Sequence, residues 1–295
     1  MQIQIIDRNT KELFQEKVYG ARWISVFYEN FLLRVIVKNY WIQKIVSKVY
    51  GFLQKQSFSK NKVEPFVKAF KISMNKFVTP AGGFKSFDDF FIRELKEEYR
   101  LFPPKQNSLG SPCEARLSVF EIKQSLAPLA VKGKQLSLKE LVGDSVKMNN
   151  FEGGHVWVFR LCPVDYHRFH FPDEGVLRSL SQLPGRLHSV NPISLEKIPN
   201  VFLENERQLS SLETKNFSEI IYLEVGAICV GEIEQFKKVG ESFARGEPKG
   251  AFHFGGSTVI MLTTSGVIPS GDLIENTNKG FETLVRVGEE IAAKD

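Results

Sequence analysis

The segment HFGGSTVIML, residues 253–262, contains a turn signal followed directly by a strand signal. Gly255 and Gly256 form a glycine pair, which usually marks a turn or a bulge. The residues after them become β-branched and apolar, which is typical of a strand. The pattern therefore predicts that the chain turns at the glycines and enters a strand at Ser257.

The same strand composition recurs through the C-terminal two thirds of the sequence. From about residue 108, β-rich runs alternate with glycine and proline turn signals. The clearest runs are RLSVFEI (116–122), HVWVFRL (155–161) and EIIYLEVGAICVGEIE (219–234). They predict a mainly antiparallel β domain, which we place at residues 106–295. Residues 101–112 contain too much proline for a helix and are expected to form a linker that leads into its first strands.

The N-terminal third has a different composition, with three stretches that predict helices. Residues 22–55 place charged side chains on one half of a helical wheel and aromatic and aliphatic side chains on the other. Residues 62–77 form a second, basic stretch, and residues 86–100 a third, with Ser86 as its N-cap. The predicted fold class is therefore α+β, with a helical region at residues 1–105 before the β domain.

Positive charge is concentrated in this N-terminal part. The formal net charge is +5, yet residues 1–80 carry 14 Lys and Arg against 5 Asp and Glu, whereas residues 81–295 carry 25 against 29. A basic amphipathic helix with an aromatic-rich apolar face is typical of a helix that lies in a membrane interface. The pattern also fits an ordinary helix that packs on the core, and periodicity alone does not separate these interpretations.

Composition excludes several classes of protein. With 42% hydrophobic residues in 295, the chain can bury a substantial core and is not disordered in bulk. No run reaches the roughly 18 apolar residues that a membrane-spanning helix needs, and the first residues lack the layout of a signal peptide. Three widely spaced cysteines, Cys113, Cys162 and Cys229, fit a reducing compartment and form no zinc motif. We therefore expect no bound metal.

Two histidines form the densest cluster of reactive side chains. The segment CPVDYHRFHFP, residues 162–172, holds His167 and His170 between two prolines. A histidine pair alone is weak evidence for a metal, but so dense a cluster favours a functional loop. A histidine base would make Ser257 a nucleophile. A serine hydrolase that uses Ser257 and His170 therefore stays open, although the G-x-S-x-G motif is missing.

Taken together, seven segments resemble the phosphatidylserine decarboxylases in their order and spacing. They are SFDDFFIRELK (86–96), SPCEARLS (111–118), DYHRFHFP (165–172), GRLHSVNP (185–192), NER (205–207), VGAICVG (225–231) and RGEPKGAFHFGGSTVIML (245–262). The Gly-Ser junction and DYHRFH are the most specific of them. The resemblance extends over most of the chain.

The resemblance implies a pyruvoyl enzyme that is made from a zymogen by self-cleavage between Gly256 and Ser257. The Ser257 hydroxyl would attack the Gly256 carbonyl and convert the peptide into an ester. β-Elimination would then release residues 1–256, and the dehydroalanine left at position 257 would hydrolyse to a pyruvoyl group on residues 257–295. Glycine tolerates the distorted backbone that such an attack needs.

The resemblance also assigns roles in this cleavage. By its position in the motif, His170 is the base that takes the Ser257 proton. The family has an acid in its S-P-x-D-G segment that orients this histidine and completes a triad. The present chain has Glu114 and Ala115 where the family has Asp and Gly. We expect Glu114 to take the orienting role, although its side chain is one methylene longer.

The implied reaction converts phosphatidylserine to phosphatidylethanolamine and CO₂, which makes the chain a carboxy-lyase. The substrate amine would form a Schiff base with the pyruvoyl group, which acts as the electron sink when CO₂ leaves. His167 is the candidate that protonates the α-carbon or binds the substrate carboxylate. Arg168 and Arg207 are candidates for contacting the substrate phosphate.

Such an enzyme would bind phosphatidylserine and an anionic membrane surface, and no nucleic acid. Each Lys or Arg near that surface contributes about 1 kcal/mol, which favours the membrane interpretation of the N-terminal helices. We expect a peripheral protein on the cytoplasmic face of a bacterial membrane, made of its own two chains after cleavage, and homo-oligomers stay open. A non-catalytic lipid-binding relative, in which the changes at Glu114 and Ala115 abolish processing, is the third interpretation.

Overall fold

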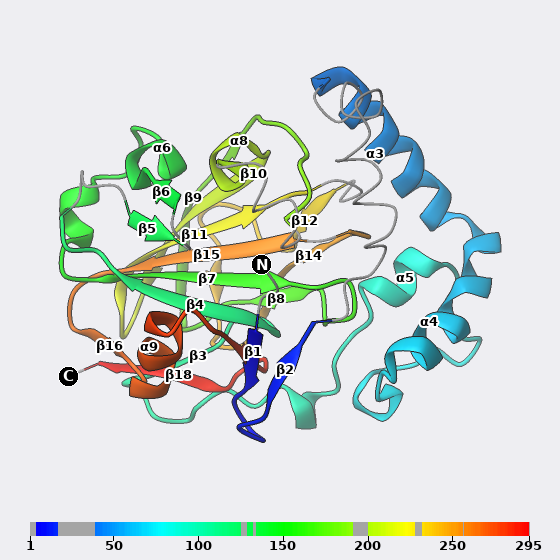
Figure 1. Ribbon diagram of the computed structural model, residues 1–295, viewed down its shortest axis with the longest axis horizontal. Coiled ribbons are helices and arrows are strands. Elements are labelled where there is room, and N and C mark those ends of the chain that lie inside the picture. The colour runs from blue at the N-terminus through cyan, green and yellow to red at the C-terminus, as the bar shows by residue number, and fades with distance from the viewer. Residues whose placement is uncertain are drawn as a thin grey trace.

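The computed structural model is built around one ten-stranded sheet (Figure 1). In order along the sheet, the strands are β13 (Ser242–Phe243), β9 (Gly175–Leu183), β10 (Arg207–Thr214), β11 (Ser218–Val225), β15 (Ser257–Thr263), β7 (His155–Leu161), β4 (Ala115–Glu121), β17 (Glu282–Val285), β1 (Gln4–Asp7) and β2 (Leu13–Gln15). Neighbours run antiparallel except β1 and β17, which run parallel. The prediction of a mainly antiparallel β domain is confirmed. The structure describes residues 4–16, 39–124, 129–131, 134–190, 200–227, 232–255 and 257–294.

The strands predicted from the sequence are four neighbours at the centre of this sheet. RLSVFEI corresponds to β4, HVWVFRL to β7, the first half of EIIYLEVGAICVGEIE to β11, and STVIML to β15. β15 lies between β11 and β7, and Ser257 is paired with Leu161 of β7. Every residue of β15 is buried. Ser257 therefore enters the protein interior as the first residue of a central strand.

Both faces of the main sheet are covered. One face packs on two small sheets, β12 (Ile233–Gln235)–β14 (Pro248–Phe252)–β8 (Arg168–His170) and β16 (Val267–Pro269)–β18 (Glu290–Lys294)–β3 (Ser108–Gly110), and on α9 (Gly271–Asn278). The other face packs on α6 (Leu138–Val142) and α8 (Val201–Glu204), near the hairpin β5 (Leu129–Val131)–β6 (Lys134–Leu136). Val259 and Met261 belong to the first core, whereas Ile260 and Leu262 belong to the second. Since side chains alternate between the faces of a strand, β15 contributes apolar residues to both cores.

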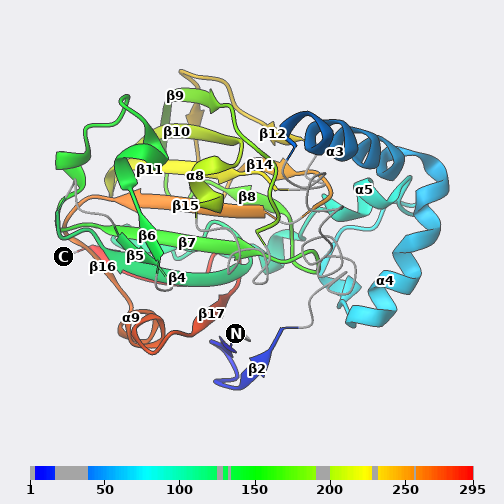
Figure 2. The same ribbon diagram turned by 45° about the horizontal axis from the view of Figure 1, so that its top comes forward.

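Three helices pack together at one end of the sheet (Figure 2). They are α3 (Tyr40–Lys55), α4 (Val63–Phe70) and α5 (Phe87–Phe91). The Ser86 side chain accepts a hydrogen bond from the Asp89 backbone N–H, as expected for the N-cap of α5. The helices share an aromatic cluster with Phe254. The helical part of the chain therefore contacts the segment that leads into β15.

The N-terminal prediction differs from the structure at several points. The helix predicted for residues 62–77 ends at Phe70, where Lys71 takes a left-handed conformation. The helix predicted for residues 86–100 ends at Phe91, because the chain after it pairs back through a bridge between Leu95 and Phe77. The first described residues form β1 and β2. These strands add to the edge of the main sheet, so they are not part of the helical region. Residues 22–38 of the first predicted helix lie outside the described residues. In the described ranges, no helix has the length and apolar content that crossing a membrane requires.

Candidate active site

Ser257 and His167 are in contact in the protein interior. The Oγ atom of Ser257 lies 3.3 Å from Nδ1 of His167, and neither residue is exposed. The other ring nitrogen, Nε2, lies 2.8 Å from the backbone carbonyl oxygen of Cys162. Because a carbonyl oxygen only accepts hydrogen bonds, Nε2 must carry the proton in the neutral ring. The lone pair of Nδ1 then faces the Ser257 hydroxyl, as a proton acceptor requires.

The surroundings of His167 keep its ring neutral. Burial lowers the pKa of His167 well below its usual value, and the positive charges of Arg93 and Arg116 lower it further. Phe91 stacks on the ring, with centroids 3.9 Å apart. A neutral imidazole in a fixed tautomer has the protonation state of a general base.

His170 has other partners. Its Nδ1 donates a hydrogen bond of 3.0 Å to the Gly246 carbonyl oxygen, so in the neutral ring Nε2 accepts a hydrogen bond of 3.2 Å from the Tyr166 hydroxyl. Burial lowers the pKa of His170 to about 3 and raises the pKa of Tyr166 to about 12, so the imidazole stays neutral and the tyrosine keeps its proton. The structure thus brings Ser257 together with His167, whereas the resemblance implies His170 as its base.

Glu114 forms no hydrogen bond with His167 or His170 in the described residues. Burial and the neighbouring Asp165 carboxylate raise the pKa of Glu114, against the opposing charges of Arg286, Arg116 and Arg93. These effects favour a carboxyl group that retains its proton. The role of Glu114 as the acid that orients His170 therefore stays a prediction.

A buried charge cluster next to the site was missed by the sequence analysis. Arg116 pairs with Asp165 and with Glu16, and Glu16 also pairs with Arg160 at 2.8 Å. Asp165 accepts a hydrogen bond of 2.6 Å from the backbone N–H of Cys162. The cluster thus holds the loop whose carbonyl group fixes the imidazole next to Ser257. The sequence signal was the presence of arginines inside two strand patterns. Such a pattern does not indicate which carboxylates pair with these arginines.

The two arginines proposed for phosphate binding have protein partners. The Arg207 guanidinium donates hydrogen bonds to four backbone carbonyl groups, those of Glu140, Leu141, Leu203 and Asn205. This side chain therefore links the segment of α6 to the segment of α8. Arg168 donates to the Ile92 carbonyl and lies 3.8 Å from Glu94. Among the described residues, neither guanidinium group forms a hydrogen bond or ion pair with the side chain of Ser257 or His167.

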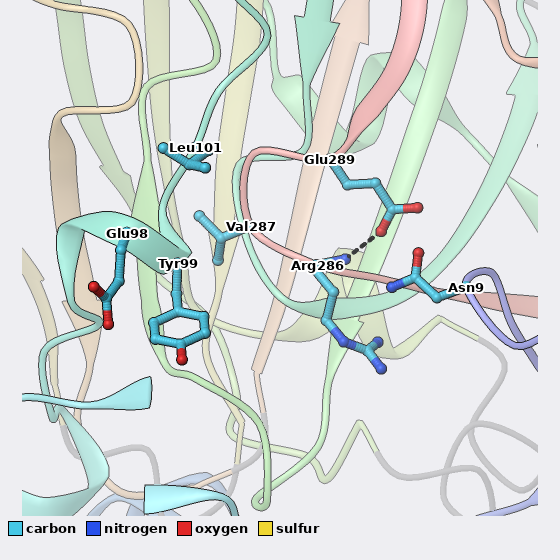
Figure 3. Close-up of a pocket in the computed structure, with 7 residues that line it drawn as sticks. All are labelled: Asn9, Glu98, Tyr99, Leu101, Arg286, Val287 and Glu289. Carbon is cyan, nitrogen blue, oxygen red and sulfur yellow. Dashed lines mark hydrogen bonds between the residues drawn. The ribbon is translucent and has the colours of Figure 1, made fainter. Parts of the chain in front are cut away.

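A shallow pocket of about 510 Å³ lies beside Arg286 (Figure 3). It is lined by Asn9, Glu98, Tyr99, Leu101, Arg286, Val287 and Glu289. The Glu289 carboxylate accepts a hydrogen bond of 2.9 Å from the Arg286 backbone N–H, drawn as a dashed line. Ser257 and His167 do not line this pocket, so it is separate from the serine–histidine contact.

Gly255, the residue of the glycine pair that the structure describes, has a backbone conformation that favours glycine. Gly255 has a φ of 147°, a conformation that residues with side chains rarely adopt. Gly256 lies outside the described residues. Among the residues that are described, no group of three or more His, Cys, Asp or Glu side chains is arranged to hold a metal ion.

Comparisons with known proteins agree with the resemblance. The profile of a family described as phosphatidylserine decarboxylase matches residues 87–293. A phosphatidylserine decarboxylase proenzyme of Clostridium kluyveri is 39% identical over 99% of both chains. Proteins of the same name from Clostridium perfringens and Ruminiclostridium cellulolyticum are 39% and 38% identical, over 99% and 98% of this chain and 100% and 97% of their own.

The matched region includes the Gly-Ser junction, both histidines and the strands that surround them. The identity extends to both ends of the chain, so it covers the helical region as well. The chain therefore belongs to the phosphatidylserine decarboxylase family.

Proposed function

We propose that the chain is the precursor of a phosphatidylserine decarboxylase, a carboxy-lyase that releases CO₂ from phosphatidylserine and leaves phosphatidylethanolamine. The relatives carry this name as proenzymes. We further propose that cleavage between Gly256 and Ser257 gives chains of residues 1–256 and 257–295. The observation that carries the proposal is the contact between the Ser257 hydroxyl and the neutral, oriented ring of His167.

Self-cleavage begins with the loss of the Ser257 hydroxyl proton. His167 is the histidine in contact with this hydroxyl, whereas the resemblance assigns the role of base to His170. Burial of Ser257 at the start of β15 keeps water away from the attacking oxygen. The positive φ of Gly255 supports a bent approach of the preceding segment. The single variants His167→Ala and His170→Ala separate the two assignments.

After cleavage, residue 257 is the proposed site of the pyruvoyl group. This group supplies the carbonyl that reacts with the substrate amine and withdraws electrons as CO₂ leaves. The surroundings of position 257 fit such a group, because Ser257 is buried beside one neutral imidazole and no cationic side chain contacts it among the described residues. We assign to His167 the transfer of the proton to the product α-carbon, a step for which Nδ1 must first take up a proton, since the proton of the neutral ring lies on Nε2.

The helical region is proposed to dock on the membrane that holds the substrate. On α3 the apolar side chains of Trp41, Ile45 and Phe52 are 61–71% exposed, while polar Gln43 and Ser47 are buried. A surface helix of a soluble protein normally buries its apolar face against the core and exposes its polar face. The exposed apolar face of α3 fits the apolar boundary of a lipid surface, which supports a peripheral membrane protein.

Within residues 1–105, we propose the helical part from α3 to α5 as the membrane-associating region, whereas β1 and β2 join residues 106–295 in the sheet of the catalytic domain. Two basic side chains of α3 form ion pairs with the β domain, Lys44 with Glu206 and Lys55 with Glu232. These pairs support a fixed orientation of α3 on the catalytic domain. The exposed face of the helix would then set how the active site meets the membrane.

The activity is tested with purified protein and vesicles that contain phosphatidylserine labelled in its carboxyl carbon. The proposal predicts release of labelled CO₂ by the wild-type chain and none by Ser257→Ala. A serine hydrolase predicts an intact chain that a fluorophosphonate labels at Ser257. A non-catalytic relative predicts binding to anionic vesicles without CO₂ release.

A further inference from the structure

Asp88 of α5 binds the two residues that precede the glycine pair. Its Oδ2 atom lies 2.7 Å from Nδ1 of His253, and its Oδ1 atom accepts a hydrogen bond of 3.0 Å from the Phe254 backbone N–H. The residue is 5% exposed. One buried carboxylate therefore fixes both a side chain and a backbone group in the segment that leads to Ser257.

The same helix also contacts the imidazole next to Ser257. Phe91 stacks on His167, and its ring centroid lies 4.9 Å from that of Phe254. Residues three positions apart lie on one face of a helix, which puts Asp88 and Phe91 on the same side of α5. The helix thus touches the segment before the cleavage site and the proposed proton acceptor together.

The contact between Asp88 and His253 favours the protonated, charged form of the ring. Burial lowers the pKa of His253, but the hydrogen bond and the negative charge of Asp88 outweigh it and raise the pKa overall. His253 Nε2 also lies 3.3 Å from Glu234 of β12, and the His253 backbone N–H donates to the Glu232 carbonyl. Lys55 of α3 pairs with the Glu232 carboxylate and opposes the charge of the ring.

We propose that Asp88 is a positioning residue for self-cleavage, holding residues 253–255 through His253 and Phe254 so that the following carbonyl meets the Ser257 hydroxyl. The inference rests on the proposed self-cleavage and deepens it. In the described part of the chain, the Asp88 carboxylate forms no hydrogen bond with Ser257 or His167, so it acts through the segment that it binds. Loss of its charge frees that segment and slows the approach of the two reacting groups.

The test measures conversion of full-length chain to fragments, by intact mass, after cell-free synthesis in the presence of anionic vesicles. Asp88→Asn keeps the shape of the side chain but removes its charge, and we expect cleavage at least tenfold slower than in the wild type. Asp89→Asn makes the same change one position later, where the carboxylate accepts a hydrogen bond from the Lys85 backbone N–H alone among the described residues. This control should cleave within twofold of the wild type.

A pH series separates positioning from a general loss of structure. His253→Gln cannot carry a charge, so the ratio of wild-type to His253→Gln cleavage rates should be largest near pH 6. It should fall toward 1 as the pH rises through the raised pKa of His253 and the wild-type ring loses its proton. Taking the ratio removes the pH dependence that all variants share.

The outcomes are distinct. A wild-type chain that does not cleave contradicts the proposed function itself. A wild-type chain that cleaves while Asp88→Asn cleaves at the same rate overturns only the positioning role. If Asp88→Asn does not fold, the His253→Gln series decides, and a rate ratio that does not change with pH overturns the proposal.

Discussion

Nδ1 of His167 lies 3.3 Å from Oγ of Ser257, and the proton on Nε2 is directed to the Cys162 carbonyl. One side of the ring is therefore fixed by the backbone and the other side faces the hydroxyl. The arrangement fits a group that accepts the Ser257 proton before cleavage. After cleavage the same ring lies next to the atoms on which decarboxylation is proposed to occur.

His167→Ala should abolish most of the decarboxylation. Loss of a positioned acid or base typically costs 10²–10⁴-fold, so we expect at least a 100-fold lower rate per mole of cleaved chain. Labelled CO₂ release, normalised to the amount of the 257–295 fragment, measures this effect. A His167→Ala enzyme that retains more than a tenth of the wild-type rate would show that another group handles the proton.

The variants His167→Ala and His170→Ala together assign the base of self-cleavage. The contact predicts that His167→Ala cleaves more slowly than His170→Ala, because only His167 reaches the Ser257 hydroxyl in the described structure. Fragment formation over time measures the difference. If only His170→Ala blocks cleavage, the base is His170, and the ring must leave Tyr166 and Gly246 to act.

The exposed face of α3 should control membrane binding. Replacing Trp41 and Phe52 together by Ser removes two large apolar side chains, each worth about 1.5–3 kcal/mol when fully buried. We expect vesicle binding in a sedimentation assay to weaken at least tenfold. Ile268→Ser is the matched control, since Ile268 is 48% exposed on the distant strand β16. Equal losses in both variants would contradict docking through α3.

Removing one partner of the ion pair between Lys249 and Glu224 should destabilise the fold much more than replacing both partners. Both side chains are fully buried and form a hydrogen bond of 2.6 Å. Lys249→Met leaves the Glu224 carboxylate buried without its counter-charge, which typically costs about 3–5 kcal/mol. Denaturant unfolding of Ser257→Ala protein, which stays uncleaved, measures the loss. The double variant Lys249→Met with Glu224→Leu should recover most of it, and failure to recover would indicate that shape rather than charge matters.

Acid should destabilise the fold through His170. Its pKa is lowered to about 3 in the folded protein, so between the usual value of 6.5 and about 3 the unfolded state binds a proton that the folded state does not. The free energy of unfolding therefore falls as the pH decreases through this window, by up to about 1.4 kcal/mol per pH unit from this residue. In the Ser257→Ala background, His170→Gln should show a shallower slope in denaturant titrations. An unchanged slope would mean that His170 does not resist protonation.

Local patterns predicted much of the fold and part of the site. The β-branched runs gave β4, β7, β11 and β15, because buried strands have that composition regardless of their partners. The helix predicted for residues 86–100 was too long, since the Phe77–Leu95 pairing is a tertiary contact that overrides local propensity.

The partners of the proposed catalytic groups were harder to predict. The histidine cluster and the Gly-Ser junction are segments that the structure brings into contact, but only the folded ring orientations distinguish His167 from His170. Asp88 and His253 are 165 positions apart, and Glu16 and Arg160 are 144 apart. No local signal links such pairs, because they meet only after the helices and the N-terminal strands pack on the sheet.

The most direct test of the central claim is the intact mass of the purified chain beside that of Ser257→Ala. The account predicts two wild-type fragments, residues 1–256 with a free carboxyl end and residues 257–295 with a pyruvoyl group and no free amine. Ser257→Ala should remain one chain of 295 residues. A wild-type protein that also remains one chain, with an unmodified serine at position 257, would contradict the account.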